Sequence, residues 1–150
     1  MTLLTILQRC FSGREIFIPG ERVIIRRIVG FDSDYLGVYV HHLCDRDHES
    51  LHNHPWKWSA ALVLTGWYAE ERATGAGQRV RRVVRAGRVN RISRSTFHRI
   101  DDVSPKGAWT LCIHGARVQG DGFLTRAAGG WTYRDAGEVS FESTRPMQRL

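Results

Sequence analysis

Apolar and polar residues alternate in short stretches along most of the chain. From residue 21 onward, strand-like stretches lie at 23–29, 35–43, 58–68, 79–84, 88–92 and 109–114, with weaker ones at 131–133 and 139–141. Glycine, aspartate, serine and proline fill the gaps, as is typical of turns. Many short strands with almost no helical periodicity predict an all-β fold, a sandwich or a barrel. The first two stretches are expected to form a hairpin.

Only the beginning of the chain shows a helical pattern. Residues 2–11 carry apolar side chains at positions 3, 4, 6, 7, 10 and 11, which predicts a short amphipathic helix that covers an edge or forms a lid. This segment is too short to span a membrane and lacks the basic residue that precedes a secretory signal. Residues 143–150 are expected to form a loosely held tail.

Composition predicts one domain over residues 1–150, because this length is sufficient for a single hydrophobic core. The net charge of +7 comes almost wholly from arginine. The arginine-rich region 79–94 lacks interleaved aromatic residues that stack on bases, so no nucleic-acid partner is expected. Cys10, Cys44 and Cys112 form no CxxC pair, which argues against disulfides and a thiolate zinc site and favours a cytoplasmic location.

Two histidines one residue apart stand before the apolar stretch 60–64. In an extended strand, residues i and i+2 point to the same face, so His52 and His54 can direct both rings at one point. A third histidine, His98, follows a later strand-like stretch and can close the site from a neighbouring strand. Three imidazoles in this arrangement predict a metal site.

These residues resemble the two sequence motifs of the cupin superfamily. The resemblance rests on His52-x-His54, the apolar strand that ends at Gly66, then Gly87 and His98. It implies a jelly roll, also called a double-stranded β-helix, with a metal site and a small-molecule ligand. The wider pattern is similar to small single-domain cupins of bacteria and phages, and it implies no particular reaction.

One departure from the cupin pattern concerns the fourth ligand. Cupins usually place a glutamate a few residues after the second histidine, where this chain has Trp58 and Ser59. A three-imidazole site is similar to that of thiol dioxygenases and some other cupin dioxygenases, and it also fits a cupin without catalytic activity. Glu49, Glu70 or Asp101 could replace the carboxylate, and their spacing favours none of them.

The metal and the cavity wall are predicted only in part. Imidazole accepts Fe(II), Zn, Ni, Cu or Mn, and Fe(II) is favoured because three protein ligands leave room for O2 and a substrate. His42 shares the alternation of Val38 and Val40 and is expected to face inward, with His41 outward. Arg27, Arg81 or Arg91 would bind an anionic substrate only on an inward face. The other candidates for the cavity wall are Trp58, Cys112, His114, Tyr39 and Tyr133.

Three hypotheses of function follow. The first is a mononuclear non-haem iron dioxygenase that acts on a small organic substrate through His52, His54 and His98. The second is a metal-independent sugar-nucleotide epimerase or isomerase, with His52 or His98 as the base and a tyrosine as the acid. The third is a non-catalytic cupin that binds a small ligand. An exposed sheet edge would allow a homodimer in each case.

Overall fold

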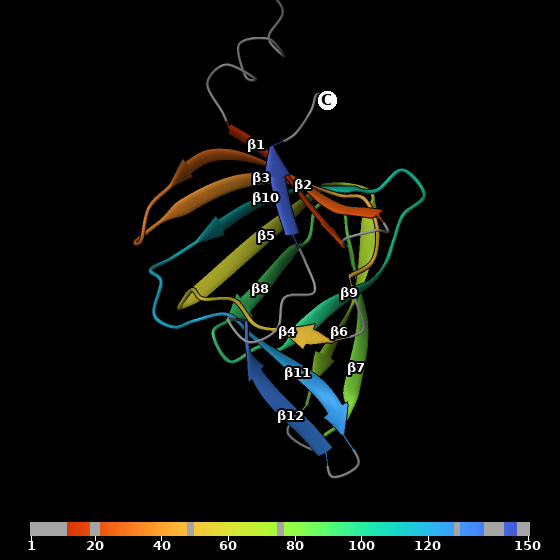
Figure 1. Cartoon of the computed structure of the whole chain (residues 1–150). Coiled ribbons are helices and arrows are strands. Elements are labelled where there is room, and N and C mark those ends of the chain that lie inside the picture. Colours follow the sequence, from red (N-terminus) through yellow and green to blue (C-terminus); the bar gives the residue numbers. More distant parts are fainter. Residues whose placement is uncertain are drawn as a thin grey trace, which may run out of the picture.

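The computed structural model describes residues 12–18, 22–47, 50–74, 77–127, 130–136 and 143–146. Within these ranges the chain forms thirteen strands and no helix, and the strands build two antiparallel sheets (Figure 1). The all-β prediction is therefore confirmed. The helix predicted at 2–11 and the weak strand at 139–141 lie outside the described residues. No helix in the described ranges is long and apolar enough to cross a membrane.

The larger sheet has seven strands and contains the predicted hairpin, because β2 pairs with β3. Residues 143–146 pair with β1 in this sheet, so the prediction of a loosely held tail is wrong for them. Backbone pairing at the sheet edge holds this segment. In order across the sheet, the strands are β13 (Ser143–Pro146), β1 (Ser12–Ile18), β2 (Arg22–Asp32), β3 (Gly37–Leu43), β10 (Ala108–His114), β5 (Trp58–Thr65) and β8 (Val89–Ser93).

The second sheet has six strands, and its β11–β12 hairpin projects at the end of the molecule opposite β1 (Figure 1). The short strand β4 sits between β11 and β9, which places the first histidine in the middle of this sheet. In order, the strands are β12 (Gly130–Asp135), β11 (Gly122–Ala127), β4 (Leu51–His52), β9 (His98–Val103), β6 (Trp67–Ala73) and β7 (Arg79–Arg85).

Gly66 divides the stretch 58–68, which the sequence pattern predicts as one strand. The glycine has a φ of +73°, and a Cβ there would lie 2.5 Å from both Gly107 O and Ser104 Oγ. The chain turns at this point, so that β5 belongs to the larger sheet and β6 to the smaller one. A glycine is needed because other residues rarely adopt this φ.

The hydrophobic core lies between the two sheets. Its buried cluster takes side chains from both of them, namely Leu43, Val63 and Ala108 from the larger sheet and Tyr68, Val84 and Ile100 from the smaller one. Alternation along each strand places these residues on the inner faces. The same inner faces continue beyond the core as the walls of a cavity.

Candidate metal centre

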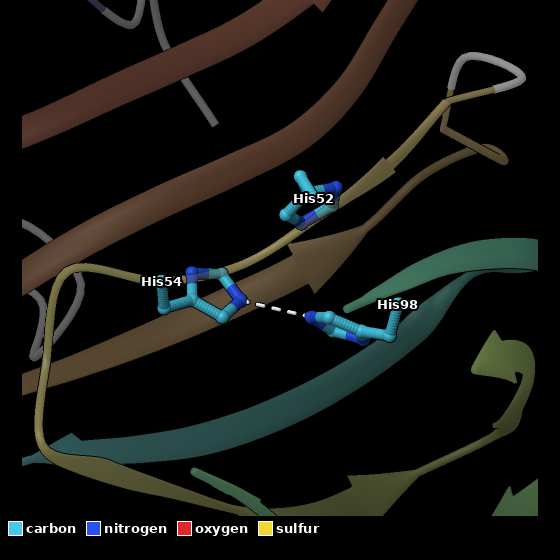
Figure 2. A group of neighbouring side chains, drawn as sticks. All are labelled: His52, His54 and His98. Atoms are coloured by element: carbon cyan, nitrogen blue, oxygen red, sulfur yellow. Dashed lines mark hydrogen bonds between the residues drawn. The ribbon is translucent and has the colours of Figure 1, made fainter. Parts of the chain in front are cut away.

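Three histidines from two segments of the smaller sheet meet at one point. His52 ends β4, His54 follows it in the next loop, and His98 begins β9 directly opposite His52 (Figure 2). One ligand nitrogen from each ring lies within 4.8 Å of the other two. The Nε2 atoms of His54 and His98 are 2.9 Å apart. The structure thus brings together all three predicted metal ligands.

This donor set fits a divalent transition metal. Imidazole nitrogens bind zinc at about 2.0–2.1 Å, so neighbouring ligands of one ion lie about 3 Å apart. The separation of 2.9 Å between His54 and His98 matches that spacing. Burial, followed by the charges of His98 and Arg27, holds the pKa of His54 well below its usual range, which favours the neutral form that binds metal.

A buried glutamate contacts the nitrogen of His98 that points away from the cluster. Glu70 Oε2 accepts a hydrogen bond from His98 Nδ1 at 3.1 Å, and Oε1 accepts one from Arg72 Nε at 2.6 Å. Arg82 Nε and Asn90 Nδ2 donate to the same carboxylate. Burial alone would raise the pKa of Glu70, but the contact with His98 and its other partners lower it to about 2. Glu70 is therefore an ionised group in the protein interior.

Asp47 approaches the first histidine from the loop before β4. Its Oδ2 lies 3.9 Å from His52 Nδ1 and accepts a hydrogen bond of 2.7 Å from the backbone of Ile100. The backbone N–H of Asp47 also donates to Ile100 O at 2.9 Å. Burial raises the pKa of this carboxyl to about 6. Two hydrogen bonds with Ile100 thus fix Asp47 against β9.

Three carboxylates were candidates to replace the cupin glutamate as a metal ligand, and the structure describes two of them, Glu70 and Asp101. Glu49 lies outside the described residues. Asp101 forms ion pairs with Arg81 and Arg99. Glu70 lies on β6 and contacts the side of the His98 ring that points away from the other two histidines. Among the described residues, no carboxylate joins the three histidines in a cluster of ligand atoms.

The cluster opens onto a cavity of about 330 Å³ between the two sheets. Tyr39, Cys112 and His114 line its wall, as the sequence predicts. Tyr39 Oη donates to His114 Nε2 at 2.9 Å, while His114 Nδ1 donates to Gly115 O at 2.8 Å. Burial and the nearby Asp32 raise the pKa of Tyr39, and burial raises that of Cys112, so both groups favour their protonated forms.

The prediction that His42 faces the cavity is wrong. Tyr39, His41 and Leu43 line the cavity, and alternation along β3 directs His42 to the opposite face. There its ring stacks on Trp109 with centroids 4.5 Å apart. Each face of β3 carries apolar residues. Val38 and Val40 lie on the same face as His42, and their apolar character wrongly indicated that this face lines the cavity.

Two aromatic candidates also lie away from the cavity wall. Trp58 is 46% exposed, and its indole packs against Gly115. Tyr133 is 50% exposed and packs against Gly122 and Phe97. Both strands alternate between faces, and packing in the folded molecule directs these two side chains outward.

Two arginines, Arg27 and Arg117, line the cavity, and Arg27 is the one of the two that the sequence analysis named. Arg27 Nε donates to His41 Nε2 at 2.8 Å, and its guanidinium lies 4.9 Å from the centroid of the Tyr39 ring. These contacts hold a positive charge on the larger-sheet side of the cavity, which the histidine cluster lines from the smaller sheet. By contrast, Arg81 pairs with Asp101, and Arg91 is exposed.

Trp56 joins the histidine cluster to the rest of the cavity wall. Its ring stacks on His54, with centroids 5.2 Å apart, and on His114, with centroids 4.1 Å apart. Sequence reasoning did not select Trp56 or Asp47 as site residues, and it named Glu70 only as one of three possible replacements for the cupin glutamate. The position of Trp56 two residues beyond His54 was the one local signal for any of them.

Comparison with solved structures agrees with this architecture. An uncharacterized conserved protein with a double-stranded β-helix domain from Klebsiella pneumoniae matches with a TM-score of 0.55 and 17% identity, over 72% of this chain and 88% of the other. Bacillus subtilis oxalate decarboxylase, which has Mn(II) centres, matches with a TM-score of 0.53 and 15% identity over 70% of this chain. The match spans 29% of the decarboxylase chain.

A candidate mannose-6-phosphate isomerase from Ralstonia eutropha matches with a TM-score of 0.52 and 14% identity, over 61% of this chain and 84% of the other. No family model and no curated protein matches the sequence. The chain has the cupin fold, a double-stranded β-helix. Within that fold it carries a three-histidine cluster suited to a divalent metal.

Proposed function

We propose that this chain is a mononuclear non-haem iron dioxygenase that acts on a small organic substrate with an anionic group. The observation that carries the proposal is a cluster of three imidazoles on the wall of a cavity that also contains an arginine. His52, His54 and His98 would hold the metal ion. Arg27 would bind the anionic group of the substrate, because a guanidinium pairs well with a carboxylate.

The protein and the ion have separate tasks in this proposal. When bound, Fe(II) supplies the O2 chemistry that amino-acid side chains lack. The chain holds the substrate beside the ion and limits its access to bulk water. Because Arg27 is fixed by its contacts with His41 and Tyr39, it would orient the substrate in one direction. The Tyr39 hydroxyl is a proton donor on the same wall.

A second candidate function is a metal-independent isomerase or epimerase. The observation that favours it is the hydrogen-bonded pair formed by Tyr39 and His114, which lines the cavity beside the three-histidine cluster. A tyrosine acid and a histidine base in one cavity can move a proton on a sugar-like substrate. This function would survive removal of the metal by a chelator, whereas the dioxygenase would not.

The test is metal analysis and O2 consumption. We would purify the wild type and the His52→Ala/His98→Ala variant without added metal and measure bound metals by mass spectrometry. His42→Ala is the matched control, because His42 lies on the outer face of β3. We expect about one iron per wild-type or control chain and none in the double variant. Iron-loaded protein should consume O2 with a member of a panel of small carboxylates.

Two results would contradict the proposal. Stoichiometric metal in the double variant would show that the three-histidine cluster is not the metal site. Iron-loaded wild type that consumes no O2 with any carboxylate would exclude the dioxygenase for that substrate class. If turnover of a phosphosugar or nucleotide sugar then persisted in a chelator, the isomerase would take its place.

A further inference from the structure

We propose that Glu70 positions His98 for metal binding and supplies, from outside the ligand set, the negative charge that three neutral imidazoles lack. The inference rests on the proposed metal site and deepens it. Glu70 is fully buried on β6, and its carboxylate contacts the Nδ1 side of the His98 ring. His98 Nε2, on the other side of the ring, faces His54.

Four groups contact the Glu70 carboxylate, and three of them, on Arg72, Arg82 and Asn90, are N–H donors. Arg72 Nε and Arg82 Nε donate to Oε1 at 2.6 and 2.5 Å. Asn90 Nδ2 donates to Oε2 at 2.8 Å, and His98 Nδ1 lies 3.1 Å from the same oxygen. The two guanidinium groups beside Oε1 favour the ionised carboxylate, which can only accept hydrogen bonds. This requirement places a proton on Nδ1 of His98.

The position of that proton determines what His98 presents to the cluster. In a neutral imidazole, a proton on Nδ1 leaves Nε2 with a free lone pair. The Nε2 atom is 2.9 Å from His54 Nε2 and is therefore the nitrogen that faces the proposed metal position. The opposite tautomer would place a proton there and block coordination. Glu70 thus selects the tautomer of His98 that can bind a metal.

Strand pairing and a residue of the other sheet hold Glu70 in place. Arg82 lies directly opposite Glu70 on β7, and Arg72 lies directly opposite His98 on β9. Asn90 reaches across from β8, where its Oδ1 accepts hydrogen bonds from both arginines. Because contacts from both sheets fix the carboxylate, it cannot turn away from His98 without breaking several hydrogen bonds.

Glutamine cannot replace Glu70 in this setting. An amide has one oxygen and one NH2 group, so in either orientation its NH2 group would face donors. The Glu70→Gln variant must therefore lose its contacts either with the two arginines or with Asn90 and His98. Glu71→Gln is the matched control. Glu71 is the next residue, carries the same charge and pairs with Arg79 and Arg99.

The first measurement needs neither a variant nor a metal. Long-range ¹⁵N–¹H spectra of the imidazole rings in the wild type, with a chelator present, report which nitrogen of His98 carries the proton. We expect Nδ1 to be protonated and Nε2 to be bare. Protonation at Nε2 with a bare Nδ1 would overturn the proposal, and this result does not depend on the folding of any variant.

In the second measurement, each protein is titrated with Co²⁺ alone. Calorimetry measures the affinity, and the visible spectrum of the bound ion reports its coordination. We expect Glu70→Gln to bind Co²⁺ about 10–100-fold more weakly than the wild type, with an altered spectrum, because groups that orient metal ligands have effects of this size. Glu71→Gln should match the wild type. The His98 tautomer should be mixed or reversed only in Glu70→Gln.

These outcomes separate the two proposals. Wild type that binds Co²⁺, with Glu70→Gln equal to it in affinity, spectrum and tautomer, would overturn the role of Glu70 and leave the metal site intact. Wild type that binds no Co²⁺ would overturn the metal site and, with it, the role of Glu70. A purely structural role for Glu70 would lower the melting temperature of Glu70→Gln without changing the tautomer of His98.

Discussion

The Nε2 atoms of His54 and His98 lie 2.9 Å apart, although 44 residues separate the two histidines in the sequence. Two ring nitrogens at this distance can share one proton or bind the same cation. Because Glu70 places the proton of His98 on Nδ1, the shared proton belongs to His54. A metal ion at this point must displace that proton. The two histidines meet only in the folded chain, so a metal ion that binds both of them stabilises the folded state.

Zinc should therefore stabilise the wild type against heat. A ligand that binds only the folded state at 100 times its dissociation constant adds about 2.7 kcal/mol. We expect Zn²⁺ to raise the melting temperature of the wild type and of His42→Ala, and to leave that of His98→Ala unchanged. Thermal unfolding with and without Zn²⁺ measures this, and each variant is compared with itself. A Zn²⁺-dependent shift in His98→Ala as large as that of the wild type would contradict the site.

The indole of Trp56 should report on metal binding. Its ring stacks on that of His54, with centroids 5.2 Å apart. An open-shell ion such as Co²⁺ quenches the fluorescence of an indole at short range, so binding should reduce the emission of the wild type. Trp56→Phe should lose most of this quenching, while Trp131→Phe should retain it. Equal quenching in the two variants would place the ion elsewhere.

The three histidines could be predicted from the sequence because their positions depend on local rules. Alternation along an extended chain aligns His52 with His54, and the cupin motif indicates His98. The face of β3 could not be predicted in this way. Val38 and Val40 are at least as apolar as Tyr39, His41 and Leu43, which line the cavity. Only the packing of the two sheets decides which of these two sets faces the cavity.

The contact between Glu70 and His98 shows a second reason why part of the site could not be predicted, although Glu70 was one of three candidate carboxylates. The sequence around it, Tyr68-Ala69-Glu70-Glu71-Arg72, is typical of a strand with a polar, solvated face. Its burial depends on donors from β7, β8 and β9, whose positions follow from the fold rather than from local sequence. Likewise, the sequence indicates that the apolar strand ends at Gly66, but the close approach of Gly107 to this turn follows from the fold.

Substitution of Gly66 should be costly for a reason specific to its surroundings. Gly66→Ala adds a Cβ at a positive φ and within 2.5 Å of a backbone oxygen, so we expect it to lower the free energy of unfolding by about 2–4 kcal/mol. Gly87→Ala is the matched control. It has a φ of +79° with no atom within 4 Å of the added Cβ, and should cost only about 1 kcal/mol. Urea unfolding measures both, and equal losses would show that the contact at Gly66 is not responsible.

Stability below neutral pH should depend on His41. Burial, followed by the charges of Arg27 and His54, lowers the pKa of His41 well below its usual range. The hydrogen bond from Arg27 Nε to His41 Nε2 also requires an unprotonated nitrogen. The unfolded chain has the ordinary pKa of about 6.5. Between the two pKa values the unfolded state binds a proton that the folded state does not, so the free energy of unfolding falls as pH falls below about 6.5.

The slope that His41 contributes can be measured by substitution. One proton accounts for up to about 1.4 kcal/mol per pH unit. We expect His41→Gln, which keeps an acceptor for Arg27, to show a shallower loss of stability between about pH 6.5 and 5 than the wild type. His42→Gln, altered at the neighbouring residue on the outer face of β3, should keep the wild-type slope. Urea unfolding across this range, with a chelator present, provides the comparison. A slope in His41→Gln as steep as that of the wild type would show that His41 is not the group responsible.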